Sequence, residues 1–154
     1  MLNMGGAAPF QIDGNLGAPA AMIESLLQSH ENVMPPKGNS SVPQAAYTGD
    51  EGKIPLVRLL PSLPEAWSAK GGGSAKGLRA RGGYVVDLSW DSVGTLRTAS
   101  LTSEAGKPIY VTLGRAQVGG DNEGTAIQVD SAVASGVFIR LDGTKDSVYN
   151  ITLA

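Results

Sequence analysis

The amino-acid sequence predicts a mainly β protein, an antiparallel β-sandwich preceded by one helix. From residue 54 to the C-terminus, short segments of alternating apolar and polar residues follow one another, separated by turns rich in Gly, Asp and Ser. No helical pattern interrupts these segments, which favours a sandwich over a parallel sheet with crossover helices. The one clear helical pattern lies close to the N-terminus.

That helix is expected over residues 18–30, whereas residues 1–17 are rich in Gly and Ala and are interpreted as a loop. Apolar residues recur at helical spacing at Ala20, Ile23, Leu26 and Leu27. Pro19 fits the first turn, where its missing N–H would have no helical partner in any case. A helix of about three turns is not stable alone, so we expect its apolar side to pack against another part of the protein.

Residues 31–53 differ in character from the segments on either side. They are rich in Pro, Gly and Ser and show no apolar period. We interpret them as a linker or insertion between two units, residues 1–30 and residues 54–154.

The sandwich strands are expected at residues 54–60, 84–90, 95–102, 109–113, 126–129, 137–141 and 148–153. The second of these has the clearest alternation, with Tyr84, Val86, Leu88 and Trp90 on one side. Because that side is apolar, it is expected to face the core, Trp90 included. Residues 68–77 are rich in Gly, Ser and Lys and are interpreted as a loop.

Composition excludes several classes of function. The net charge of the 154-residue chain is −2, and its Lys and Arg residues are scattered, so we expect neither nucleic acid nor a membrane as a partner. No apolar run reaches the length of a membrane span. The absence of cysteine excludes disulfides and thiolate sites, and His30 is the single histidine. We therefore expect no metal site and no cofactor.

The segment from Pro9 to Gly17 is the part of the sequence that looks most like an active site. Asp13 lies there between flexible glycines, just before the expected helix, and a carboxylate so placed can act as a general base. Gln11 and Asn15 can form hydrogen bonds with sugar hydroxyls. However, Asp and Asn also commonly cap helices, and local chemistry alone favours capping.

Other candidates have simpler explanations. His30 can interact with the last carbonyls of the helix. Trp67 can stack on a sugar, and Arg79 and Arg81 are expected to form ion pairs at the surface or at an interface. The glycine runs lack the Gly-Lys-Ser/Thr ending of a phosphate-binding loop.

Three segments together resemble the C-terminal end of glycoside hydrolase family 95, the 1,2-α-L-fucosidases. They are residues 9–17 continuing to His30, residues 59–67 (LLPSLPEAW), and residues 77–84 (GLRARGGY) with Val86, Asp87 and Trp90. The resemblance implies an (α/α)6 barrel followed by a β-sandwich. Residues 1–30 would then be the active-site loop and last helix of the barrel, and residues 54–154 the C-terminal sandwich.

The resemblance also implies a role for Asp13. It matches the motif aspartate that activates the attacking water in these inverting enzymes, together with asparagines elsewhere in the barrel. Inversion needs a second carboxylic acid, about 6.5–9.5 Å from the first, and in this family that acid precedes the region seen here. We therefore expect this chain to be a fragment that is inactive alone, with a fucosylated glycan and the rest of the barrel as its partners.

The sequence departs from the family pattern in two places. Leu16 stands where the family usually has Phe, and the stretch from Asn32 to Lys53 is longer than the usual link between helix and strand. Two alternatives stay open: a non-catalytic β-sandwich module that binds glycan or braces a partner domain, and a family member that acts on α-L-galactosides. The resemblance implies a secreted enzyme. Without the barrel, the helix would expose its apolar side, and we expect self-association.

Overall fold

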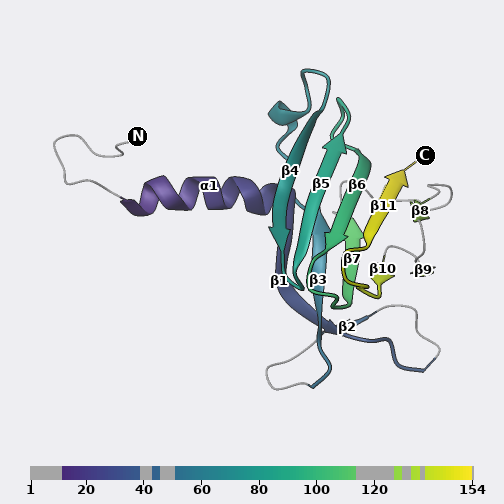
Figure 1. Ribbon diagram of the computed structural model, residues 1–154. Coiled ribbons are helices and arrows are strands. Elements are labelled where there is room, and N and C mark those ends of the chain that lie inside the picture. Colours follow the sequence, from purple (N-terminus) through teal and green to yellow (C-terminus); the bar gives the residue numbers. More distant parts are fainter. Residues whose placement is uncertain are drawn as a thin grey trace.

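The computed structural model describes residues 12–38, 43–45, 51–113, 127–129, 133–135 and 138–153. The chain starts with α1 (Ile12–Leu26), which runs directly into β1 (Leu27–Met34) (Figure 1). The strands that follow are β2 (Gln44–Ala45), β3 (Ile54–Leu59), β4 (Gly73–Ala80), β5 (Tyr84–Trp90), β6 (Leu96–Ser103), β7 (Ile109–Leu113), β8 (Ile127–Val129), β9 (Val133–Ser135), β10 (Phe138–Leu141) and β11 (Val148–Leu153). A 3₁₀ turn, Glu65–Trp67, lies between β3 and β4.

The strands form two sheets, which confirms the predicted mainly β sandwich. One sheet has the strand order β2-β1-β3-β7-β10-β9, and the other has the order β4-β5-β6-β11-β8. Neighbouring strands are antiparallel except for β3 and β7, which run parallel. Connections between neighbours such as β5 and β6 are short turns, as in antiparallel sandwiches.

The main core lies between the two sheets. On β5, Tyr84, Val86, Leu88 and Trp90 are all buried, as their alternation predicts, and they belong to one cluster with β3 and β7 residues such as Val57 and Val111. A second, smaller cluster consists of Val33, Ile54, Leu56 and Tyr110, with Phe138 packed against it. Leu56 and Val57 are consecutive on β3 and therefore point to opposite faces of the six-stranded sheet.

The helix is displaced from its expected position. It begins at Ile12 rather than residue 18 and ends at Leu26 rather than residue 30, so Pro19 lies inside it and not in its first turn. Leu27–Met34 instead pairs antiparallel with β3, in the register Leu27↔Leu59 and Val33↔Ile54. The hydrogen bonds and core packing that β3 offers prevail here over the helical spacing of Leu26 and Leu27.

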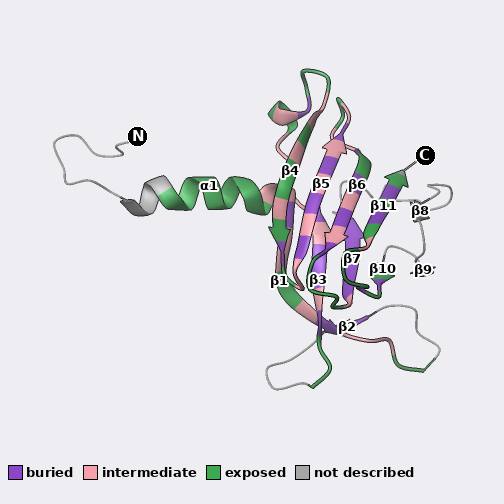
Figure 2. Cartoon of the chain, viewed as in Figure 1, coloured by how far each residue is buried: buried purple, intermediate pink, exposed green. Residues whose placement is uncertain are grey.

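Most of α1 is solvent-exposed, as expected for this helix without a barrel around it, and its apolar side does not pack against the sandwich. Leu16, Met22 and Ile23 are 66%, 54% and 47% exposed, respectively. Only the last turn is part of the folded body, where Leu26 packs against the main core. Figure 2 shows this contrast between the exposed helix and the buried interiors of the strands.

Strand β4 starts inside the segment that composition marks as a loop. A Cβ on Gly73 would lie 2.5 Å from the Trp90 ring, and one on Gly72 would lie 2.3 Å from the Trp90 carbonyl oxygen. Glycine at these two positions therefore lets β4 lie closely over the end of β5. Strand β9 was also not predicted.

Candidate functional site

Two of the three predicted site residues lie at the N-terminal end of α1. The backbone places Asp13 and Asn15 in the first turns of the helix, whereas Gln11 lies outside the described residues. Figure 1 shows the helix extending away from both sheets. Because a helix rises about 1.5 Å per residue, Asp13 lies roughly 20 Å along the axis from the sandwich end of α1. The catalytic role of Asp13 stays a prediction.

The other end of α1 is fixed to the sandwich by backbone hydrogen bonds. The amide of Leu60 donates to the carbonyl oxygen of Leu26 at 2.8 Å, and that of Ser62 donates to Ser25 at 3.3 Å. These bonds satisfy carbonyls that a helix end leaves without intrahelical partners. They hold the last turn of α1 against the chain that follows β3.

Leu60 adopts an unusual conformation in making this contact. Its φ is +47°, a region that costs a residue with a side chain about 1–3 kcal/mol. The side chain is 1% exposed and belongs to the main core, so burial offsets the backbone strain. The conformation therefore lets one residue fill the core and bind the helix end.

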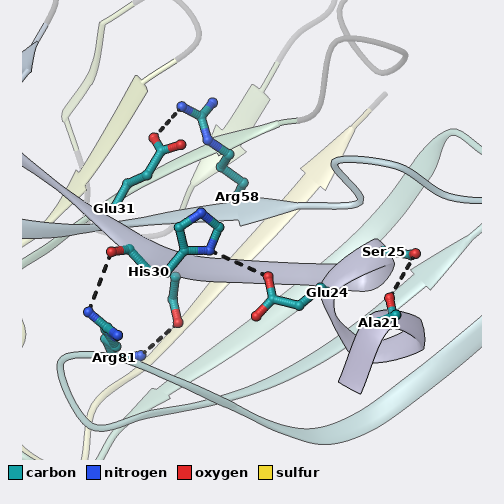
Figure 3. A network of polar contacts seen from close by, with 8 residues as sticks. Ala21, Glu24, Ser25, His30, Glu31, Arg58 and Arg81 are labelled. Atoms are coloured by element: carbon teal, nitrogen blue, oxygen red, sulfur yellow. Dashed lines mark hydrogen bonds and ion pairs between the residues drawn. The ribbon is translucent and has the colours of Figure 1, made fainter. Parts of the chain in front are cut away.

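Arg81 joins the same region from a third segment. Its backbone amide donates to Ser29 Oγ at 3.1 Å, and its Nη1 donates to the His30 carbonyl oxygen at 3.4 Å (Figure 3). We call Leu26, Ser29, His30, Leu60 and Arg81 the helix–sandwich junction. Each of the three segments that resemble family 95 contributes to it, although they are far apart in the sequence.

Two contacts between polar side chains lie beside the junction on the solvent side. His30 Nδ1 lies 3.5 Å from Glu24 Oε2, and Arg58 Nη2 lies 2.6 Å from Glu31 Oε2 (Figure 3). His30 is therefore on β1 beside a glutamate and does not cap the helix. The partners are substantially exposed, so each pair contributes only about 0–1 kcal/mol.

The remaining candidates fall outside this region or have structural roles. Trp90 is buried, as predicted, and its Nε1 donates to the Trp67 carbonyl oxygen at 3.4 Å. Arg79 forms the predicted surface pair, with Glu104. In the part of the chain that the structure describes, no three His, Asp or Glu side chains gather closely enough to hold a metal ion. No helix there is long and apolar enough to cross a membrane.

The junction could not be predicted from the local sequence. Its contacts join residues that are far apart in the sequence; Arg81 and Ser29, for example, are 52 positions apart. Much of the hydrogen bonding is through backbone groups. Side-chain type and local spacing carry no signal for such contacts. The shared resemblance of the three segments was the one available indication that they belong together.

The chain is similar in sequence to a known family over its C-terminal two thirds. Residues 52–151 match the family model described as glycoside hydrolase family 95, C-terminal domain. The "Probable alpha-fucosidase A" of Aspergillus niger is 38% identical over 91 residues, which cover 59% of this chain and 10% of the relative. The protein of the same name from Aspergillus oryzae is 40% identical over 104 residues, covering 66% of this chain and 12% of the relative.

These matches agree with the mainly β fold and extend over most of the sandwich. The chain spans only about a tenth of the length of these curated relatives. The match to the family model covers well over half of the 154 residues. The chain therefore belongs to glycoside hydrolase family 95, and it carries that family's C-terminal domain.

Proposed function

We propose that this chain is the C-terminal portion of an inverting α-L-fucosidase that removes terminal α-1,2-linked L-fucose from glycans. The observation that carries this proposal is the family match over residues 52–151, together with relatives named as α-fucosidases. Residues 1–30 would be the end of an (α/α)6 barrel, residues 31–53 a linker or insertion, and residues 54–154 the C-terminal sandwich. The strands do not stop at these boundaries, because β1 and β2 belong to the six-stranded sheet and extend the sandwich back to Leu27.

The exposed surface of α1 supports the proposal that this helix packs against another domain of the enzyme. Leu16, Met22 and Ile23 present apolar surface that a barrel packed around α1 would bury. The junction holds only the C-terminal end of the helix, so its N-terminal end is free to lie among other helices. Both features fit a helix whose packing partners belong to another part of the enzyme.

Asp13 would act as the general base. In an inverting hydrolase, one carboxylate takes a proton from the attacking water while a carboxylic acid on the other side of the sugar protonates the leaving oxygen. Asp13 supplies the first group, and Gln11 and Asn15 would hold sugar hydroxyls by hydrogen bonds. The acid would come from the remainder of the barrel, so this chain would not hydrolyse glycosides by itself.

Two assays test the proposal. The isolated chain is incubated with 2′-fucosyllactose, and no release of fucose is expected; robust turnover would contradict the claim that it lacks the acid. The longer enzyme is then followed by proton NMR as it cleaves the same substrate. Inversion predicts that β-L-fucose forms first, whereas α-L-fucose as the first product would contradict the mechanism. A matched α-L-galactoside that is cleaved faster would change the sugar assignment and leave the family mechanism intact.

A further inference from the structure

The outer face of the five-stranded sheet carries a groove that the proposed catalytic role does not use. Its volume is about 330 Å³, near the lower end of the range for small-molecule sites, and it crosses β4, β5, β6 and β11. Figure 1 shows these four strands side by side. Helix α1 continues into β1, which is a strand of the six-stranded sheet. The groove lies on the other, five-stranded sheet.

Two rows of polar side chains cross the sheet in this groove. The strand register aligns Ser74 with Ser89, Ser89 with Thr98, and Thr98 with Thr152. Two residues along the strands, the same register aligns Asp87 with Ser100 and Ser100 with Asn150. Because neighbouring strands are about 4.8 Å apart, a row across four strands spans roughly 14 Å.

The hollow follows from the sizes of these side chains. The middle of the groove is formed by serine and threonine, whereas Lys76 and Asn150, from strands on either side, are longer and exposed. Between Ala75 and Leu78 the register of β4 against β5 shifts by a bulge. Bulges re-aim side chains and often occur beside binding sites.

Part of the polar lining is already held in place. Within the bulge, the Gly77 amide donates to Asp87 Oδ1 at 2.7 Å, and Ser89 Oγ lies 2.7 Å from Thr98 Oγ1. The carboxylate and the hydroxyl pair are therefore oriented before any ligand arrives. Such preorganisation reduces the entropy that binding must overcome.

We propose that this groove is a non-catalytic binding site for a neutral oligosaccharide, with room for one or two sugar rings. Its hydroxyl, amide and carboxylate groups can both donate to and accept from the hydroxyls of a sugar. Its one ammonium and one carboxylate, from Lys76 and Asp87, balance in charge and give an anionic ligand no advantage. No aromatic side chain is among the described residues that line it, so ring stacking does not contribute and the expected affinity is modest.

The proposal does not depend on Asp13 or on the hydrolase activity. The site belongs to the sandwich alone, which this chain contains. Loss of oligosaccharide binding would leave the catalytic proposal standing, and an Asp13→Asn enzyme that keeps its activity, which would refute the catalytic role, would leave this one standing.

The test is a titration of the ¹⁵N-labelled chain with 2′-fucosyllactose, lactose and maltotriose, followed by ¹H–¹⁵N NMR. We expect at least one of these sugars to shift amides of β5, β6 and β11 along the groove, with a Kd of about 1 mM or tighter. Absence of shifts with all three sugars, or shifts confined to other parts of the chain, would overturn the proposal. Groove amides that respond instead to dilution of the protein would assign the face to contact between copies.

Two tyrosine variants provide a matched pair. Ser100→Tyr fills the middle of the groove, whereas Thr102→Tyr places the same side chain on the same face of β6, outside the lining residues. Ser100→Tyr should weaken binding at least about tenfold, and Thr102→Tyr should leave it within about twofold. Equal affinity in both variants would place the sugar elsewhere. Because a tyrosine can disturb the sheet, Asn150→Ala, which only removes a side chain, is expected to weaken binding in the same direction.

Discussion

At the scale of single residues, two tyrosine side chains and one glycine hold the turn before β11. Gly143 has a φ of +75°, and a Cβ there would lie 1.9 Å from the Lys107 carbonyl oxygen. That oxygen also accepts a hydrogen bond from Tyr84, at 2.9 Å. The amides of Gly143 and Thr144 both donate to the Tyr149 hydroxyl at 3.1 Å. This turn therefore needs glycine for space as well as for conformation.

We predict that Gly143→Ala destabilises the fold by more than about 3 kcal/mol, because the backbone clash adds to the unfavourable φ. Gly52 is the matched control, since its φ is +73° but nothing lies within 4 Å of a Cβ there. Gly52→Ala should cost only about 1 kcal/mol. Urea denaturation of both variants measures the difference, and equal losses would show that space at Gly143 is not limiting.

Tyr84 gives the fold a dependence on alkaline pH. Burial, the largest cause, raises the pKa of its hydroxyl above the ordinary value of 10.0. Its stabilising contribution is therefore complete below pH 10 and is lost as the pH rises through the folded-state pKa. In Tyr84→Phe this dependence disappears, together with about 1 kcal/mol from the hydrogen bond to Lys107.

Urea denaturation of the wild type and Tyr84→Phe from about pH 8 to pH 11 tests this. The stability difference between the two proteins should shrink above about pH 10. A difference that stays constant over the whole range would show that Tyr84 titrates normally.

At the scale of elements, the junction decides how α1 meets the sandwich. Arg81 binds the first residues of β1, and the amides of Leu60 and Ser62 bind the last turn of the helix. These contacts act on a helix that has little other contact with the body, so each should affect how often the helix end opens. Local opening of this kind is measured by amide exchange.

We predict that Arg81→Ala speeds hydrogen exchange at the Leu60 amide about three- to tenfold, since one side-chain hydrogen bond is worth about 0.5–1.5 kcal/mol. Arg97→Ala is the control, because Arg97 pairs with Asp91 at the turn between β5 and β6. It should leave exchange at Leu60 unchanged. Equal effects from the two variants would indicate general destabilisation and not a role at the junction.

The elements also show what the sequence could predict and what it could not. Residues 84–90 were predicted well because one face is buried and the other is not, which produces a clean alternation. Residues 73–80 were missed because their composition is that of a loop; they form a strand because β5 offers hydrogen bonds and Gly73 fits over Trp90. Leu27–Met34 was missed because tertiary pairing with β3 outweighs local spacing.

The candidate site was predictable in a different way. Local chemistry at Asp13 favoured a helix cap, and resemblance of distant segments raised it to a candidate base. The junction and the groove have no local signal, since they depend on strand register and on contacts between segments such as Ser29 and Arg81. Family membership could be predicted because several segments of the sequence contribute to it together.

At the scale of the whole molecule, α1 gives the chain an unusual shape, a β-sandwich with an exposed helix (Figure 2). A 15-residue helix is marginal by itself, and Pro19 inside it removes one backbone hydrogen bond. Burying its apolar residues against another surface would stabilise it. In the proposed enzyme that surface is the barrel, and in the isolated chain we expect it to be another copy.

We predict that the isolated chain self-associates through this helix and that Met22→Glu with Ile23→Lys makes it monomeric. The two substitutions together keep the net charge and replace apolar surface that is about half exposed. Light scattering over a range of protein concentrations measures the effect. A wild-type chain that is monomeric throughout, or a double variant that associates equally well, would exclude α1 as the contact.

The central claim is that Asp13 is the general base of a family 95 hydrolase. Its most direct test is the Asp13→Asn variant in the longer enzyme, assayed on 2′-fucosyllactose, with Glu24→Gln in the same helix as the control. The amide keeps the shape but accepts no proton, so kcat should fall about 10²- to 10⁴-fold with KM nearly unchanged, whereas Glu24→Gln should keep its rate. An Asp13→Asn enzyme with a kcat close to the wild-type value would contradict the claim and reduce Asp13 to a structural residue of α1.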